Sequence, residues 1–234
     1  MLPIAAPAAA PAKTIFKNLL AISLPIAIGS IAMNITTPID YYTVQSGLET
    51  AIKNGESIIQ SLYASVLETQ TTLEKLPVYL YGLYNTAYTL YNLVPTIALS
   101  FGVSALPAVT QAWTMKNKLM LQGNIERALR VTALLAFPGG IGLFALAEPI
   151  VTMLYSGMND PGALVIAASM LRVLGLTTII SAICNPMSSI LQGMGRADLP
   201  VKFVFSGLAI KLLTNYLLIR IPSVNIMGAA IGTA

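Results

Sequence analysis

Long apolar stretches follow one another along the chain, separated by shorter polar connections. A helix needs about 20 predominantly apolar residues to cross the hydrocarbon core of a bilayer. The pattern predicts membrane spans at residues 18–42, 78–112, 131–155, 163–192, 199–219 and 226–234. The last stretch is too short to cross, so we expect a final helix that is truncated in this sequence. The predicted fold is an all-α, polytopic membrane protein built as one six-helix bundle.

The connections between these spans carry a second pattern. Basic residues concentrate on alternate connections; by the positive-inside rule this places the N-terminus in the cytoplasm. Arg220 is the exception. The Ala/Pro-rich residues 1–14 are predicted to be a cytoplasmic linker, and the connection 46–78 is predicted to lie outside. Apolar residues recur there at helical spacing, which predicts an amphipathic helix at the outer surface.

Composition agrees with a membrane location. The chain is 56% hydrophobic and 9% charged, whereas a soluble domain has about 25% charged residues. Its mean hydropathy is +0.75. We therefore expect a multi-pass protein of the cytoplasmic membrane, with the lipid bilayer as its surroundings. No basic run with interleaved aromatic residues suggests nucleic acid as a partner.

The residue types also limit the chemistry. The chain contains no histidine and one cysteine, Cys184. This excludes catalytic triads that use histidine and zinc sites built on histidine. We expect Cys184 to be a small packing residue. The prediction is a protein that is not an enzyme, with no catalytic residues, no metal and no cofactor.

One segment is unusually polar for a membrane span. Residues 79–95 read YLYGLYNTAYTLYNLVP, with five tyrosines and two asparagines. At about 100° per residue, one helix face carries the tyrosines from position 81 onward and both asparagines. We predict that Tyr79 and Tyr81 anchor the helix at the outer interface. The deeper residues are predicted to line a cavity, with interhelical hydrogen bonds as the alternative; they are Tyr84, Asn85, Tyr88, Tyr91 and Asn92.

Ionisable residues inside the predicted spans are further candidates, because each is costly in lipid unless it faces protein or water. Lys211 lies in the fifth span, with Asn215 one turn further on the same face, and Arg172 lies in the fourth span. Asp40 lies towards the outer end of the first. Two cations in a bundle suit an anionic ligand. The alternatives are an ion pair of Asp40 with Arg172 or Lys211, snorkelling of the cations, and a proton or sodium site at Asp40.

Several motifs together resemble a known family. They are ALP at 105–107, FPGGIGL at 137–143, AEPI at 147–150 and LQGMGRADLP at 191–200. Their order resembles the second half of flippases of the MATE-like (MOP) superfamily. Within it, the stage V sporulation protein B and polysaccharide biosynthesis transporters are most similar. The resemblance covers residues 15–234. One departure is Leu90, at a position where lipid II flippases of the superfamily carry an arginine.

The resemblance implies half of an alternating-access flippase. Its expected substrate is a lipid-linked oligosaccharide or polysaccharide precursor with an anionic diphosphate, used in cell-wall or surface-glycan assembly. An N-terminal six-helix bundle would be the missing partner. Three alternatives remain open: a multidrug or toxin cation-coupled exporter of the same superfamily, a membrane-embedded glycan polymerase or ligase, and a fragment that associates with a partner half without transporting.

Overall fold

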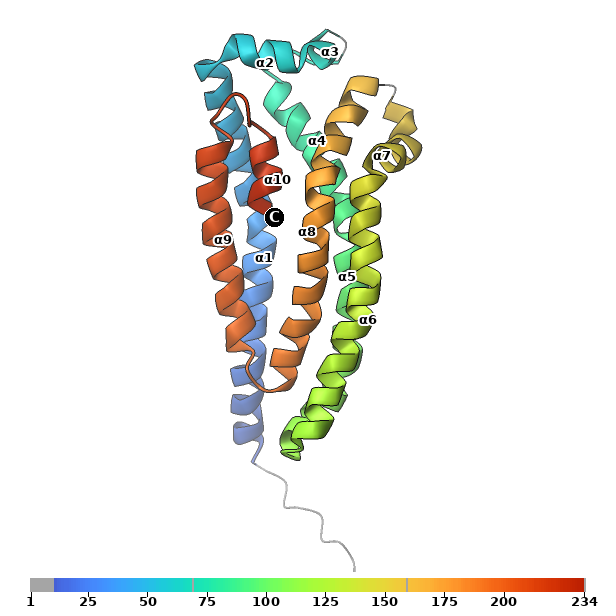
Figure 1. Ribbon diagram of the computed structural model, residues 1–234. Coiled ribbons are helices and arrows are strands. Elements are labelled where there is room, and N and C mark those ends of the chain that lie inside the picture. The colour runs from blue at the N-terminus through green and yellow to red at the C-terminus, as the bar shows by residue number, and fades with distance from the viewer. Residues whose placement is uncertain (1–10, 69, 159, 234) are drawn as a thin grey trace, which may run out of the picture.

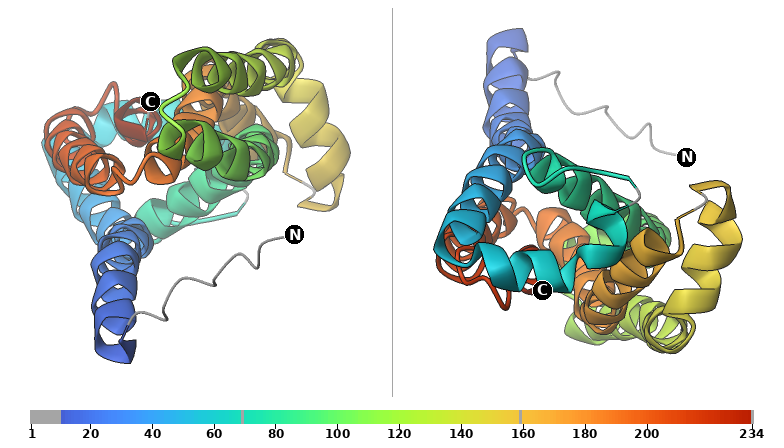
Figure 2. Two further views of the ribbon diagram at one scale, coloured as in Figure 1. Left: turned by 90° about the horizontal axis from the view of Figure 1, so that it is seen from below. Right: turned by 90° about the horizontal axis from the view of Figure 1, so that it is seen from above.

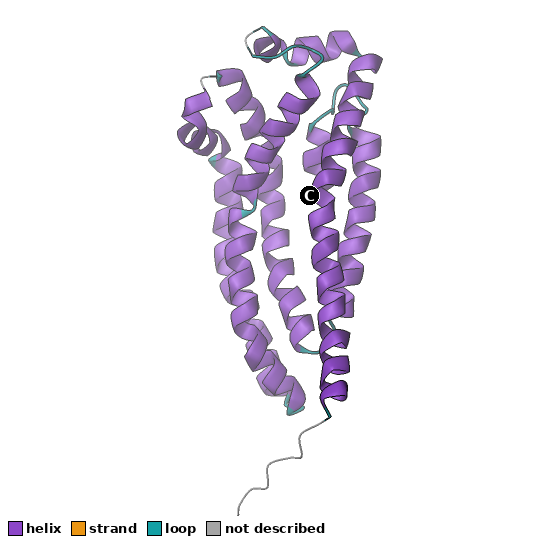
Figure 3. Cartoon of the chain, turned by 180° about the vertical axis from the view of Figure 1, so that it is seen from behind, coloured by secondary structure: helices purple, strands orange, loops and turns teal. Residues whose placement is uncertain are grey.

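The computed structural model describes residues 11–68, 70–158 and 160–233, and every regular element in those residues is a helix (Figure 3). Figure 1 shows the helices arranged mainly lengthwise, with α2 and α3 lying across one end. The helices are α1 (Ala12–Asn54), α2 (Glu56–Leu62), α3 (Ala64–Leu67), α4 (Leu76–Tyr91), α5 (Leu93–Thr114), α6 (Lys118–Ala145), α7 (Ala147–Tyr155), α8 (Pro161–Gly193), α9 (Asp198–Leu218) and α10 (Met227–Thr233).

The prediction of an all-α, polytopic membrane protein is confirmed. Among the described residues, four helical segments are long and apolar enough to cross a membrane: Leu76–Thr114, Lys118–Ala145, Pro161–Gly193 and Asp198–Leu218. The count of six spans and the cytoplasmic N-terminus stay predictions. Most of the predicted linker, residues 1–10, lies outside the described residues, and α1 already begins at Ala12.

Two predicted spans are each divided between two helices. Residues 131–155 belong to α6, which begins at Lys118, and to α7, which follows a break at Leu146. Residues 78–112 belong to α4 and α5, which meet at Asn92. Pro95 has no N–H to donate to the carbonyl of Tyr91 four residues earlier. The Thr178 hydroxyl of α8 lies 3.5 Å from that carbonyl and 3.1 Å from the carbonyl of Leu174, so it can donate to either.

The helices form two groups. In one, α5, α6 and α8 pack tightly against one another, and in the other α1 packs against α9. Figure 2 shows the two groups on opposite sides of the bundle when it is viewed along its length. The first group depends on small residues: a Cβ on Gly102 of α5 would lie 2.6 Å from the Cα of Pro186 in α8. Such close backbone approach is common between membrane helices.

The two groups are connected mainly at one end. α4 contacts both α1 and α8, and α10 contacts both α8 and α9. The predicted outer connection, 46–78, contains the end of α1, α2 and α3, with Ile59 and Val66 buried. Tyr63, between α2 and α3, donates its hydroxyl to Asn225, in the turn before α10. Burial raises the pKa of Tyr63 above its ordinary value, so this hydroxyl stays protonated and able to donate.

Candidate functional site

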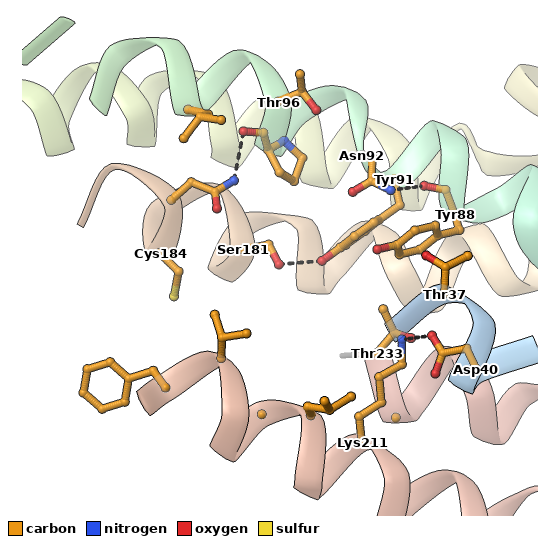
Figure 4. A pocket seen from close by; sticks show the side chains of 18 of the residues that line it. Thr37, Asp40, Tyr88, Tyr91, Asn92, Thr96, Ser181, Cys184, Lys211 and Thr233 are labelled. Atoms are coloured by element: carbon orange, nitrogen blue, oxygen red, sulfur yellow. Dashed lines mark hydrogen bonds and ion pairs between the residues drawn. The ribbon is translucent and has the colours of Figure 1, made fainter. Parts of the chain in front are cut away.

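A cavity of about 640 Å³ lies between the two helix groups. Its walls come from α1, α4, α5, α8, α9 and α10, and its volume falls within the roughly 300–1,000 Å³ typical of small-molecule sites. Figure 4 shows side chains of three of these helices converging on it, with Tyr88 and Tyr91 on α4, Ser181 on α8 and Lys211 on α9. Residues distant in sequence therefore share one polar space.

The polar face of α4 lines this cavity. The structure places Tyr84, Asn85, Tyr88, Tyr91 and Asn92 in its wall. The rings of Tyr84, Tyr88 and Tyr91 stack in series, with centroids 5.8 Å and 5.5 Å apart and interplanar angles of 19° and 22°. Offset stacking of this kind is favourable beyond the area that it buries. The result is a continuous aromatic surface along one side of the cavity.

At the start of the tyrosine face, the position of Tyr81 differs from the prediction. Tyr81 was predicted to anchor the helix at the interface, but it is 8% exposed and lines the cavity. Its ring meets that of Tyr41 edge-on at 5.2 Å, so the aromatic surface continues onto α1. Tyr79 donates its hydroxyl to Asp160 at 2.7 Å. Asp160 in turn accepts from the backbone N–H of Ala163, which caps the start of α8.

Several of these polar groups are also bonded within the protein. The Tyr84 hydroxyl pairs with that of Thr233 at 2.7 Å. The Tyr91 hydroxyl pairs with that of Ser181 at 2.5 Å, as Figure 4 shows. The alternative interpretation, interhelical hydrogen bonding, is thus realised at both positions. The half-buried Tyr88 lies between them, and no hydrogen bond of its hydroxyl occurs within the described residues.

Asp40 and Lys211 form an ion pair at the edge of the cavity, joining α1 to α9 (Figure 4). Their side chains are 8% and 12% exposed. Asn215, buried one turn from Lys211, donates to the second carboxylate oxygen of Asp40 at 3.4 Å. Its position is behind the pair rather than in the cavity wall. Of the ion pairs that the sequence allowed, the structure forms the one with Lys211.

Arg172 lies elsewhere. Its guanidinium donates to Glu148 at 3.0 Å, and the two side chains are 49% and 58% exposed. Arg172 does not line the cavity. The position of Arg172 within a predicted span could not reveal its ion-pair partner, because Glu148 lies on another helix, α7. Among the described residues, the cavity wall consequently holds one cation and one anion in a single pair, instead of the predicted excess of cations.

Polar residues of α8 complete the wall. Ser181, Asn185 and Ser188 recur at the spacing of one helix face, and all three line the cavity. Asn185 also donates to the carbonyl of Pro95 at 3.0 Å, just beyond the break between α4 and α5. Cys184, predicted to be a packing residue, is exposed and lines the cavity. The spacing of these serines and Asn185 was the signal that could have placed α8 in the site.

The chemistry of the wall favours noncovalent recognition. It offers hydroxyls, amides and aromatic ring faces around one neutralised ion pair. No group of three or more His, Cys, Asp or Glu side chains suited to a metal ion occurs among the described residues. Long apolar helices around a central polar cavity are the arrangement used by membrane transporters.

Comparison with known proteins agrees with this class. The MatE family matches residues 82–217, more than half of the chain. The chain therefore belongs to the MatE family. The match begins in α4 and ends in α9, so it includes the stacked rings of Tyr84, Tyr88 and Tyr91, and Lys211. No solved structure matches the chain.

Three curated relatives come from Bacillus subtilis (strain 168). The chain is 26% identical to the uncharacterized membrane protein YabM over 65% of its length, 26% identical to the lipid II flippase MurJ over 59%, and 25% identical to stage V sporulation protein B over 62%. These matches cover 27%, 25% and 27% of the three relatives, so the chain spans about a quarter of their length. The similarity supports a transporter or flippase of the MOP type located in the cytoplasmic membrane.

Proposed function

We propose that this chain forms the cavity-bearing half of an alternating-access flippase for a lipid-linked oligosaccharide or polysaccharide precursor. Its proposed site consists of Asp40, Tyr84, Asn85, Tyr88, Tyr91, Asn92 and Lys211, with Asn215 supporting the ion pair. A second six-helix bundle would complete the transport pathway. Moving a headgroup across the membrane requires no covalent chemistry, since the cavity has only to replace the water around that headgroup.

The observation that carries the proposal is the aromatic and amide-lined wall of α4. Sugars present hydroxyls that hydrogen-bond to amides and hydroxyls, and apolar faces of C–H groups that pack on aromatic rings. Tyr84, Tyr88 and Tyr91 provide the stacked rings, while Asn85 and Asn92 add amides on the same side. Similarity to a lipid II flippase supports a lipid-linked substrate.

Arg172 lies outside the site, so Lys211 is the cation of the described cavity wall that a diphosphate can reach. A diphosphate can bind the Lys211 ammonium only in competition with Asp40, because Lys211 is already neutralised there. We infer that the anionic group of the substrate displaces Asp40 from Lys211. This would loosen the link between α1 and α9 at the moment of binding. The same pairing argues against an exporter of organic cations, since Asp40 is not a free acid in this state.

A transport assay tests the proposal. The chain is co-reconstituted in liposomes with a six-span bundle encoded in the same or an adjacent reading frame. Flipping of a fluorescent lipid-linked oligosaccharide by the wild type is compared with flipping by Tyr88→Ala and Lys211→Ala. We expect both variants to lose at least about tenfold in rate, a loss of about 1.4 kcal/mol. Phe137→Ala removes a half-exposed ring of α6 outside the cavity and is the matched control. Transport by both cavity variants at the rate of the control would refute the proposed site.

The requirement for a second bundle has its own test. Flipping is measured for the chain alone and for the chain co-reconstituted with a six-span bundle encoded in the same or an adjacent reading frame. We expect transport only with both parts present. Transport by the chain alone, at the rate of the pair, would show that the second bundle is unnecessary.

A further inference from the structure

A second, smaller groove lies on the surface between α1 and α9. It has a volume of about 330 Å³ and is lined by Tyr42, Thr43, Ser46, Leu212, Tyr216 and Arg220. None of these residues lines the central cavity. Arg220 is also the basic residue that departs from the alternation of charge along the chain. The proposed transport function therefore gives no role to this groove or to Arg220.

Arg220 is held without a carboxylate partner. Its guanidinium lies over the ring of Tyr216, with Cζ 3.6 Å from the ring centroid. Within the described residues, no Asp or Glu oxygen lies within 4.0 Å of it, and no acidic residue lines the groove. Stacking occupies one face of the planar guanidinium and leaves its N–H groups, which point outward in the plane, able to bind an anion.

Hydroxyl groups stand beside this cation. Thr43 uses its hydroxyl in a bond to the carbonyl of Ile39, at 2.8 Å. The hydroxyl of Ser46, one turn further along α1, is exposed and has no such bond among the described residues. Arg and hydroxyl donors together are a usual set for binding a phosphate. The absence of an acid in the groove disfavours headgroups that also carry an ammonium.

The surface around the groove is apolar. Tyr42 and Tyr216 are 71% and 57% exposed, and Leu213 and Leu217 of α9 are also largely exposed. Only 6% of the most apolar stretch of α9 is buried within the protein. In a bilayer such a face contacts acyl chains, and Arg220, at the end of the apolar run, would lie at headgroup level. A single ligand with a phosphate at Arg220 and acyl chains along α9 would fit both the cationic groove and the apolar face beside it.

We propose that this groove binds the phosphate of an anionic bilayer phospholipid, such as phosphatidylglycerol, with Arg220 as the principal donor. The headgroup lies between Tyr216 and Ser46, and the acyl chains extend along the exposed leucines of α9. The bound lipid bridges α1 and α9, the same helices that Asp40 and Lys211 join. It is a structural ligand, separate from the transported substrate.

Native mass spectrometry of the detergent-solubilised protein tests this proposal, with phosphatidylglycerol and phosphatidylcholine titrated separately. We expect the wild type to bind phosphatidylglycerol at least about tenfold more tightly, and Arg220→Ala to abolish that preference. Removing one hydrogen bond in Ser46→Ala should weaken binding by roughly two- to tenfold. Arg172→Ala is the matched control, because that arginine already has a carboxylate partner, and its preference should equal that of the wild type.

Two further readouts distinguish a lipid site from a general anion site and from a loss of folding. Phosphatidylglycerol should raise the melting temperature of the wild type and not that of Arg220→Ala, while the lipid-free melting temperatures should agree. Excess inorganic phosphate should not displace the lipid. Equal binding of both lipids by the wild type, an unchanged preference in Arg220→Ala, or displacement by inorganic phosphate would each overturn the proposal.

Discussion

The Lys211 ammonium on α9 and the Asp40 carboxylate on α1 form a buried ion pair across 171 positions of sequence. Asn215 adds a hydrogen bond to the same carboxylate. Taking two charges out of water is costly, and their attraction offsets that cost only while both partners remain. The pair therefore fixes how α1 and α9 meet, and in the described part of the chain it leaves the cavity wall with no net formal charge.

Removing one partner should destabilise the protein more than removing both. We expect Lys211→Met or Asp40→Asn alone to cost about 3 kcal/mol, because each leaves a buried group without its partner. The double variant should recover a large part of this loss. Thermal unfolding in detergent measures the stability of each variant, with Lys202→Ala as the control. Lys202 forms an exposed pair with Asp198, and water and salt screen such a pair, so its loss should hardly change the melting temperature. Additive losses in the double variant would contradict this account of the pair.

Tyr88 separates the role of the ring from that of the hydroxyl. No hydrogen bond of its hydroxyl occurs within the described residues, while its ring stacks between those of Tyr84 and Tyr91. Tyr88→Phe should bind the oligosaccharide headgroup within about twofold of the wild type. Tyr88→Ala should bind it roughly two- to tenfold more weakly, as the loss of a stacking ring predicts. Isothermal titration calorimetry measures both; equal losses in the two variants would assign the role to the hydroxyl.

Cys184 provides a direct test of where the substrate lies. It is the one cysteine of the chain, it is exposed, and it lines the cavity. A small polar maleimide should label it in the purified protein, whereas Cys184→Ser should remain unlabelled. A saturating lipid-linked oligosaccharide should slow the labelling severalfold. Labelling at an unchanged rate would place the substrate outside this part of the cavity.

Local patterns predicted the helices and the polar face of α4, because helical periodicity depends on residues close in sequence. Tyr84 and Tyr91 were correctly placed on an inward face by spacing alone. Partners were less predictable, because they depend on distances between helices. The sequence offered Asp40 two cations, and only the packing of α1 against α9 selected Lys211. The break at Asn92 has a local signal in Pro95, but the α8 side chains near it, Thr178 and Asn185, could be found only from the packing of the helices.

The contact between α5 and α8 depends on Gly102. A Cβ at this position would lie 2.6 Å from the backbone Cα of Pro186, and no rotation of a side chain can relieve a clash with backbone. Gly102→Ala should force the helices apart and cost about 1–3 kcal/mol. It should also weaken the wall that Asn185, next to Pro186, contributes to the cavity.

Gly142→Ala is the matched control for this substitution. It is also a helical glycine, but nothing lies within 4 Å of the added Cβ. Since alanine favours a helix over glycine by about 1 kcal/mol, this variant should be neutral or slightly stabilised. Thermal unfolding of both variants in the same detergent gives the comparison. If Gly102→Ala were as stable as Gly142→Ala, α5 and α8 would have to be further apart than the structure places them.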